Sequence, residues 1–107
     1  MKYSVVFSSK TGNTQQLANA ITSLLPESDL IYFGPPSECA LQADRFYIGF
    51  WTDKGHCNAE IADFLKHLKG KDIFLFGTAG FGGSAEYFKK ILTAVEKYID
   101  SSNTVIG

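Results

Sequence analysis

The sequence predicts a three-layer α/β domain in which helices cover both faces of a doubly wound parallel sheet. Short apolar runs alternate along the chain with longer segments whose apolar residues recur at helical spacing. Strands that are apolar on both faces are typical of buried parallel sheets, and their alternation with helices indicates βαβ units. The 107 residues predict a single domain, residues 1–107, because chains divide into several domains only beyond about 250 residues.

The predicted strands are short runs bounded by polar or turn residues. The first run, residues 3–7, is too short for a helix and is followed by Ser8 and Ser9. The second is closed by Gly-Pro-Pro at residues 34–36, which cannot continue a ladder. Strands are expected at residues 3–7, 29–33, 46–51 and 73–76, with the start of a fifth at Asn103.

The predicted helices begin at capping residues and end at proline or glycine. Pro26 stops the first apolar stripe, and Ser37 can cap one or two helical turns. Asn58 can cap the next helix, which Gly70 ends in a left-handed conformation, and Ser84 opens the last. The expected helical segments are residues 13–25, 37–43, 58–69 and 84–99.

Composition excludes several classes of partner. The net charge of −1 argues against nucleic acid, because nucleic-acid binders carry a basic surplus. No apolar run approaches the roughly 20 residues of a membrane span, and the N-terminus lacks a signal-peptide core, so we expect no membrane partner and a cytoplasmic protein. Cys39 and Cys57 lie outside any Cys-x-x-Cys motif and are expected as free thiols, and no residues have the spacing of a metal site.

The loop after the first strand, residues 8–14, is a candidate phosphate site. It leads into the N-terminus of a helix, where unpaired N–H groups and the helix dipole favour an anion. Gly12 allows close backbone approach, and Lys10 carries the only formal charge between residues 8 and 26. Hydroxyl and amide donors are offered by Ser9, Thr11, Asn13 and Thr14. The same composition also suits an ordinary N-capping loop.

Residues 5–21 resemble the flavodoxin signature, in which a strand leads into Ser-x-Thr-Gly-Asn-Thr and then a helix. Residues 49–55 and 76–83 resemble a branch of short flavodoxin-like proteins, some of which partner bilirubin-reducing enzymes. The resemblance implies FMN as cofactor and a flavodoxin-like strand order of 2-1-3-4-5. It further implies that the FMN phosphate is wrapped by Ser9, Lys10 through its backbone, Thr11, Gly12, Asn13 and Thr14.

The flavin ring would lie between the loops that follow the third and fourth strands. Trp51 and Phe81 are the aromatic residues placed to stack on it. Each has a structural alternative, because Trp51 can be the last apolar residue of its strand and Phe81 can pack beneath its own loop. Backbone groups near the ring are expected from Gly77, Thr78, Gly80, Gly82 and Gly83.

The loop after the third strand departs from the common flavodoxin pattern. Counted from Gly49, Thr52 corresponds to the threonine that reaches the phosphate, and Asp53 stands where the stacking aromatic is usual. Gly83 similarly stands where a tyrosine is usual after the fourth strand. Gly55 is the candidate for the backbone carbonyl that turns toward the flavin to tune its potential, since glycine turns most easily.

The resemblance implies an electron carrier that binds FMN and hands electrons to a reductase partner. A flavodoxin-fold NAD(P)H or quinone reductase that forms its substrate site as a dimer is the alternative. A binding module that has lost its cofactor is a third possibility, because the stacking positions are altered.

The chain is short for the fold it predicts. Five βα units of about 30 residues need about 150. The last predicted strand begins at Asn103, and a closing helix is missing. We therefore expect either a fragment of a longer flavodoxin-like protein or a homodimer that pairs through the incomplete sheet edge.

Overall fold

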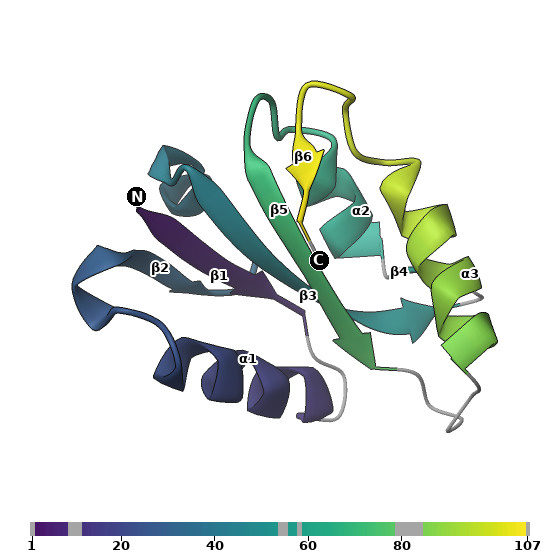
Figure 1. Cartoon of the computed structure of the whole chain (residues 1–107), viewed down its shortest axis with the longest axis horizontal. Coiled ribbons are helices and arrows are strands. Elements are labelled where there is room, and N and C mark those ends of the chain that lie inside the picture. The colour runs from purple at the N-terminus through teal and green to yellow at the C-terminus, as the bar shows by residue number, and fades with distance from the viewer. Residues whose placement is uncertain (1, 9–11, 54–55, 58, 79–84, 107) are drawn as a thin grey trace.

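A computed structural model describes residues 2–8, 12–53, 56, 57, 59–78 and 85–106 of the chain. Parallel strands form the sheet in the order β2-β1-β3-β5-β6, and β4 pairs antiparallel with the end of β3 (Figure 1). The strands are β1 (Tyr3–Phe7), β2 (Leu30–Gly34), β3 (Arg45–Asp53), β4 (His56–Cys57), β5 (Asp72–Thr78) and β6 (Thr104–Val105). The predicted α/β class and the strand order 2-1-3-4-5 are confirmed.

Helices cover both faces of this sheet. Helix α1 packs across β1, β3 and β5 on one face, while α2 and α3 lie on the opposite side (Figure 1). The helical segments are α1 (Asn13–Ser23), α2 (Ala59–Leu65), α3 (Ala85–Glu96) and the 3-10 turns η1 (Glu27–Asp29) and η2 (Glu38–Gln42). The predicted turn at residues 37–43 is confirmed, and the hydroxyl of Ser37 accepts from the Cys39 N–H at 3.3 Å.

Helices α1, α2 and α3 end earlier than their apolar stripes predict, α3 at Glu96 instead of residue 99. Helix α1 ends at Ser23, and Leu24 of the predicted stripe is 85% exposed because it is already the capping residue. Helix α2 ends at Leu65, yet Leu68 stays buried, and Gly70 adopts the expected left-handed conformation with φ +64°. An apolar pattern therefore predicts which face is buried better than it predicts where the helix ends.

Two apolar clusters lie on opposite faces of the sheet. Alternate residues of β3 divide between them: Phe46 and Ile48 pack toward α2 and α3, whereas Tyr47 packs toward α1. On the α1 side, the rings of Tyr3 and Phe74 meet the Tyr47 ring at centroid distances of 5.7 and 5.4 Å. Burial of both faces explains why the central strands are apolar at consecutive positions.

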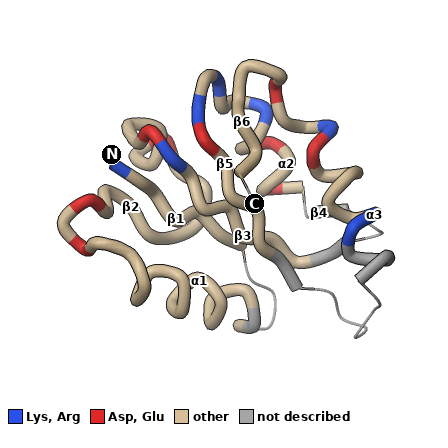
Figure 2. Tube along the Cα trace, in the orientation of Figure 1, with Lys and Arg blue, Asp and Glu red and all other residues tan. Residues whose placement is uncertain are grey.

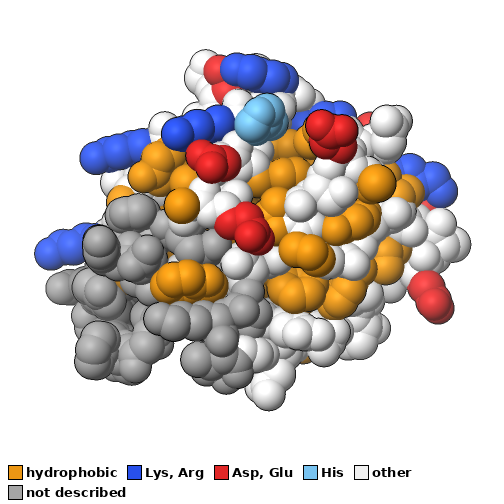
Figure 3. Space-filling model, turned by 180° about the vertical axis from the view of Figure 1, so that it is seen from behind, with side chains coloured by type: hydrophobic (Ala, Val, Ile, Leu, Met, Phe, Trp, Pro, Cys, Tyr) orange, Lys and Arg blue, Asp and Glu red, His pale blue; other side chains and the backbone are white. Residues whose placement is uncertain are grey.

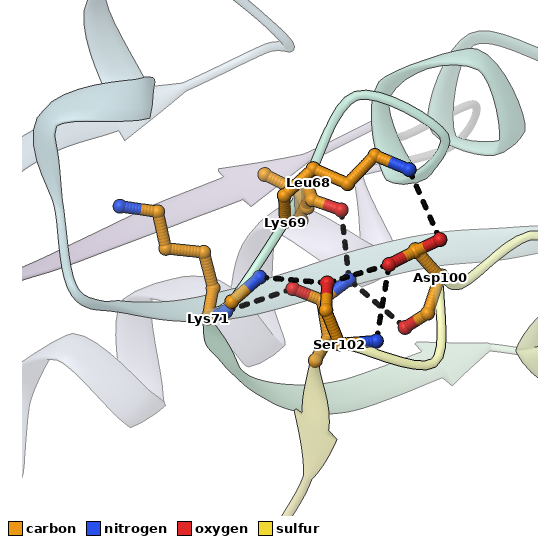
Figure 4. A network of polar contacts seen from close by, with 7 residues as sticks. Leu68, Lys69, Lys71, Asp100 and Ser102 are labelled. Atoms are coloured by element: carbon orange, nitrogen blue, oxygen red, sulfur yellow. Dashed lines mark hydrogen bonds and ion pairs between the residues drawn. The ribbon is translucent and has the colours of Figure 1, made fainter.

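The amino ends of β5 and β6 are fastened by one asparagine side chain (Figure 4). The amide nitrogen of Asn103 donates to the Leu68 carbonyl at 2.8 Å and to the Asp100 carbonyl at 3.2 Å. Its amide oxygen accepts from the Lys71 N–H at 2.8 Å. These contacts hold the segment before β6 against the segment before β5, so the parallel pairing of the two strands begins at a fixed register.

Asp100 anchors the turn that carries this asparagine. Its carboxylate accepts hydrogen bonds from the hydroxyl and the N–H of Ser102 and forms an ion pair with Lys69 Nζ at 3.0 Å. The hydrogen bonds from Ser102, followed by that from Lys69, lower the pKa of Asp100 from 3.8 to about 2. The side chain is therefore ionised across the neutral and mildly acidic range.

Candidate functional site

The carboxyl ends of β1, β3 and β5 meet at one edge of the sheet, and the loops that leave this edge carry the predicted site. In an open α/β sheet, ligands bind beyond this edge where the strand order reverses. Gly12, Asn13, Thr14, Trp51, Thr52, Asp53 and Thr78 lie in the described part of the chain. Outside it lie Ser9, Lys10, Thr11, Gly55, Gly80, Phe81 and Gly82.

Gly12 caps α1 in a conformation that favours glycine. Its φ of 89° and ψ of −11° are left-handed, and a Cβ added there would meet no atom within 4 Å. Its carbonyl accepts the Gln16 N–H at 3.0 Å, which starts the helix. A side chain at this position would therefore be opposed by the backbone conformation and not by a neighbouring described atom.

The first turn of α1 presents no negative charge. It holds no acidic residue, and the tube of α1 carries no charged residue along its described length (Figure 2). The partial positive charge of a helix N-terminus is then not opposed by a nearby carboxylate of the same helix. This turn can attract an anion through its backbone and its dipole.

Thr14 ties the start of α1 to the end of β3. The residue is 1% exposed, and its hydroxyl lies 3.4 Å from the Phe50 carbonyl, to which it donates. The family resemblance predicts that a threonine at this position faces a phosphate. In the structure the hydroxyl donates to a main-chain acceptor in β3, so Thr14 also fixes the helix N-terminus relative to the strand that leads to Trp51.

Gly49 lets three strands approach closely just before the site. The Gly49 carbonyl accepts the Ser8 N–H at 3.1 Å, which holds the exit of β1 against β3. A Cβ at Gly49 would lie 2.5 Å from Cζ of Phe76 and 3.0 Å from Cβ of Phe7. The importance of Gly49 for packing could not be predicted from the sequence. No neighbouring residue indicates that the Phe76 ring of β5 occupies the space where a side chain at Gly49 would lie.

Trp51 lies within β3, half-buried and in register with Thr78 at the end of β5. The prediction that the strand ends at residue 51 and is followed by a loop through Cys57 is wrong for most of that range. Strand β3 continues through Asp53, and Asp53 pairs with His56 in an antiparallel hairpin. The Lys54-Gly55 sequence between them was the available signal, because two-residue hairpin loops favour glycine.

The remaining predicted features form no second site at this edge. Among the described residues, no group of three or more potential metal ligands comes together. Cys39 is a free, exposed thiol, and His67 is exposed with its Nδ1 2.7 Å from the Asp63 carbonyl. No helix in the described ranges has the length and apolar character needed to cross a membrane.

The strand order and a first turn of α1 without acidic residues define a protein of the doubly wound flavodoxin-like class. The model of the flavodoxin domain family matches residues 4–107, and the chain belongs to that family. The family resemblance carried by residues 5–21 is thereby confirmed.

Known proteins agree with this assignment. The chain is 41% identical over 111 residues to the flavodoxin-like domain-containing protein BilS of Clostridium symbiosum (strain WAL-14163), covering 88% of this chain and 58% of the relative. It is 32% identical over 114 residues to the BilS protein of Clostridioides difficile (strain CD3), covering 100% of this chain and 63% of the relative. The chain thus spans about three-fifths of the length of these curated relatives.

A solved structure shows the same fold. A flavoprotein from Lactobacillus acidophilus NCFM, determined in complex with FMN, superposes with a TM-score of 0.73. The two chains are 18% identical, and the match covers 99% of this chain and 90% of the other.

Proposed function

We propose that this chain binds FMN at the carboxyl edge of its sheet and carries electrons to a reductase partner. The observation that carries the proposal is the left-handed Gly12 cap and the acid-free first turn of α1 in a chain of the flavodoxin family. The FMN complex of the Lactobacillus flavoprotein, which has the same fold, supports FMN as the flavin. FMN would supply the redox chemistry, and the protein would bind and orient it.

The phosphate end would be held by the turn after β1. The start of α1 offers backbone N–H groups and a dipole, and no acid of its first turn repels a phosphate. Ser9, Lys10, Thr11, Asn13 and Thr14 remain the proposed phosphate contacts around Gly12. The link from Thr14 to Phe50 supports the placement, because it aligns the phosphate turn with the end of β3.

The ring end would lie beside β3 and β5. Trp51 is half-buried near the end of β3, at the edge where the ring would lie, and an aromatic side chain there suits a flat ring. The β3–β4 hairpin carries Thr52 and Asp53 and leads through Gly55, the proposed site of potential tuning. Contacts after β5 are proposed for Thr78, Gly80, Phe81 and Gly82.

Electron transfer asks less of this edge than proton-transfer catalysis does. General acid–base catalysis needs a group that titrates near neutral pH; Ser8, Thr14 and Trp51 provide none, and His56 of β4 would be the candidate for the reductase alternative. A carrier requires only a bound flavin and a surface that a partner can reach. The two relatives named BilS are described as flavodoxin-like domain-containing proteins, which agrees with a flavodoxin-type role.

FMN binding is tested with two glycine variants that differ only in location. Gly12 and Gly70 both have positive φ and open space where a methyl group would be added, but Gly70 lies at the opposite edge of the sheet. Gly12→Ala and Gly70→Ala should each lose about 1 kcal/mol of stability, because both force a left-handed alanine. Only Gly12→Ala should weaken FMN binding, by about tenfold, in a flavin-fluorescence titration. Equal affinities for the two variants would remove the Gly12 turn from the site.

Carrier and reductase roles are separated by a second experiment. The FMN-loaded protein should not oxidise NADPH faster than free FMN does, but after photoreduction it should reduce a one-electron acceptor such as cytochrome c. Steady NADPH oxidation by the protein alone would assign it to the reductase class. Failure to retain FMN at micromolar concentration would assign it to the class without cofactor.

A further inference from the structure

An open groove of about 520 Å³ lies between η2 and α2, on the sheet face opposite α1. Its floor is apolar and its rim is acidic. Figure 3 shows this face, where acidic side chains stand among exposed hydrophobic ones. The residues that define it are Pro36, Leu41 and Phe64 on the apolar side and Glu38, Glu60 and Asp63 on the acidic side.

The negative charge of the groove is not balanced by its own lining. Glu38, Glu60 and Asp63 are all exposed, and the described lining includes no lysine or arginine. The nearest neutralising contact is from Lys66, whose Nζ lies 4.0 Å from Asp63 and 5.4 Å from the centre of the Tyr98 ring. An ion pair this long and exposed contributes little, so a cationic group would find at least two carboxylates available.

One end of the groove faces the carboxyl edge of the sheet. Pro36 follows the carboxyl end of β2, and Glu60 is the second residue of α2, which follows the β3–β4 hairpin. The other end reaches the amino half of the sheet, because the Ala40 carbonyl of η2 accepts from the hydroxyl of Ser4 near the start of β1. A protein segment that lies along the groove and extends past Pro36 and Glu60 would bring its parent protein to the carboxyl edge.

We infer that the groove docks a segment of the redox partner that presents lysine or arginine side chains beside an apolar side chain. The carboxylates would attract and orient the basic groups, and Leu41 and Phe64 would receive the apolar one. This pairing of an apolar centre with a charged rim is typical of transient protein interfaces, in which arginine is enriched. The inference rests on the proposed carrier function, because it names the chemistry of the carrier's partner.

The test uses a synthetic probe and needs no flavin. The ¹⁵N-labelled chain is titrated with a peptide of alternating arginine and leucine, and amide shifts are followed by NMR. Shifts are expected at residues 36–42 and 60–67. Peptides of alternating glutamate and leucine, and of arginine and serine, should bind at least tenfold more weakly, since each removes one half of the complementarity.

Matched variants locate the charge effect. Glu38→Gln with Glu60→Gln removes two exposed carboxylates from the groove, and Glu27→Gln with Glu96→Gln removes two exposed carboxylates elsewhere. The double variant in the groove should bind the arginine–leucine peptide about two- to thirty-fold more weakly than the wild type, as expected for the loss of two surface ion pairs. The control double variant should lose less than twofold in affinity. Raising the salt concentration should diminish the difference between the pairs.

Several outcomes would overturn the inference. One is an equal loss of peptide affinity in the groove variant and the control variant. Another is a set of amide shifts confined to other segments. A third is binding of argininamide alone as tight as that of the peptide, which would indicate a small-cation site. Concentration-dependent shifts of the groove without peptide would assign it to a second copy of the chain. FMN affinity is measured separately, on the wild type and on the groove pair. A wild type that does not bind FMN contradicts the proposed function without affecting the docking result.

Discussion

Replacing Gly49 by alanine should destabilise the protein through contact with one aromatic ring. The added Cβ would lie 2.5 Å from Cζ of Phe76, and Phe76 is only 8% exposed, so its ring cannot move freely into solvent. The Cβ would also lie 3.0 Å from Cβ of Phe7, a position fixed by the β1 backbone. Overpacking of this kind costs about 1–3 kcal/mol.

The assay is urea unfolding of the wild type, Gly49→Ala, Phe76→Leu and the double variant. Gly49→Ala should lower the free energy of unfolding by about 1–3 kcal/mol with an unchanged urea dependence. In the Phe76→Leu background the same substitution should cost at least about 1 kcal/mol less, because the two residues share the space and their effects do not add. The double variant thus measures the contact itself.

A functional consequence follows from the same position. The Gly49 carbonyl accepts the Ser8 N–H, so a shift of β3 moves the exit of β1 and the turn behind it. FMN affinity should fall in Gly49→Ala and recover in part in the double variant. An unfolding cost below about 0.5 kcal/mol, the range of substitutions that touch nothing, would refute the argument, as would an equal cost in both backgrounds.

Three further predictions concern stability alone. Thr14→Val should cost about 0.5–1.5 kcal/mol in urea unfolding, because it removes the buried hydrogen bond to the Phe50 carbonyl; a neutral result would show that the 3.4 Å contact is not a hydrogen bond. The folded-state pKa of Asp100, about 2, lies below its ordinary 3.8, so its stabilisation is complete above pH 4 and is lost as the pH falls toward 2. Asp100→Asn should therefore be less stable than the wild type at pH 7 and approach it at pH 2, and parallel pH profiles would contradict this. Leu24→Gln should change stability by less than about 0.5 kcal/mol, since Leu24 is 85% exposed, and a larger loss would mean that α1 extends beyond Ser23.

Local patterns predicted the elements of the first βα unit and the turn at Gly12, whereas the order of the sheet followed from the family resemblance. The first strand, the polar loop and the amphipathic segment are consecutive in sequence, so each part of the βα unit can be recognised from its neighbours. The clamp at Asn103 and the space shared by Gly49 and Phe76 could not be recognised in this way. Both depend on residues that are distant in sequence and meet only after the strands pair.

The β3–β4 hairpin was missed for a different reason. The residues of β4, His56 and Cys57, are too few to produce the alternation that identifies a strand. The sequence predicts a tight turn at residues 53–55 beside the flavin, but not the strand after it that pairs with β3. A hairpin that begins and ends on paired residues, Asp53 with His56, restricts the backbone on both sides of Gly55.

The Asn103 clamp lies at the amino edge of the sheet, while the Gly12 turn and the β3–β4 hairpin leave the carboxyl edge. The contacts that set the register of β5 and β6 are thus separated from the proposed cofactor loops by the full length of the strands. Loops from other members of the family could therefore be transplanted onto the carboxyl edge without altering the residues that fix strand pairing. Flavin specificity would then vary in such chimaeras while the register of β5 and β6 stays the same.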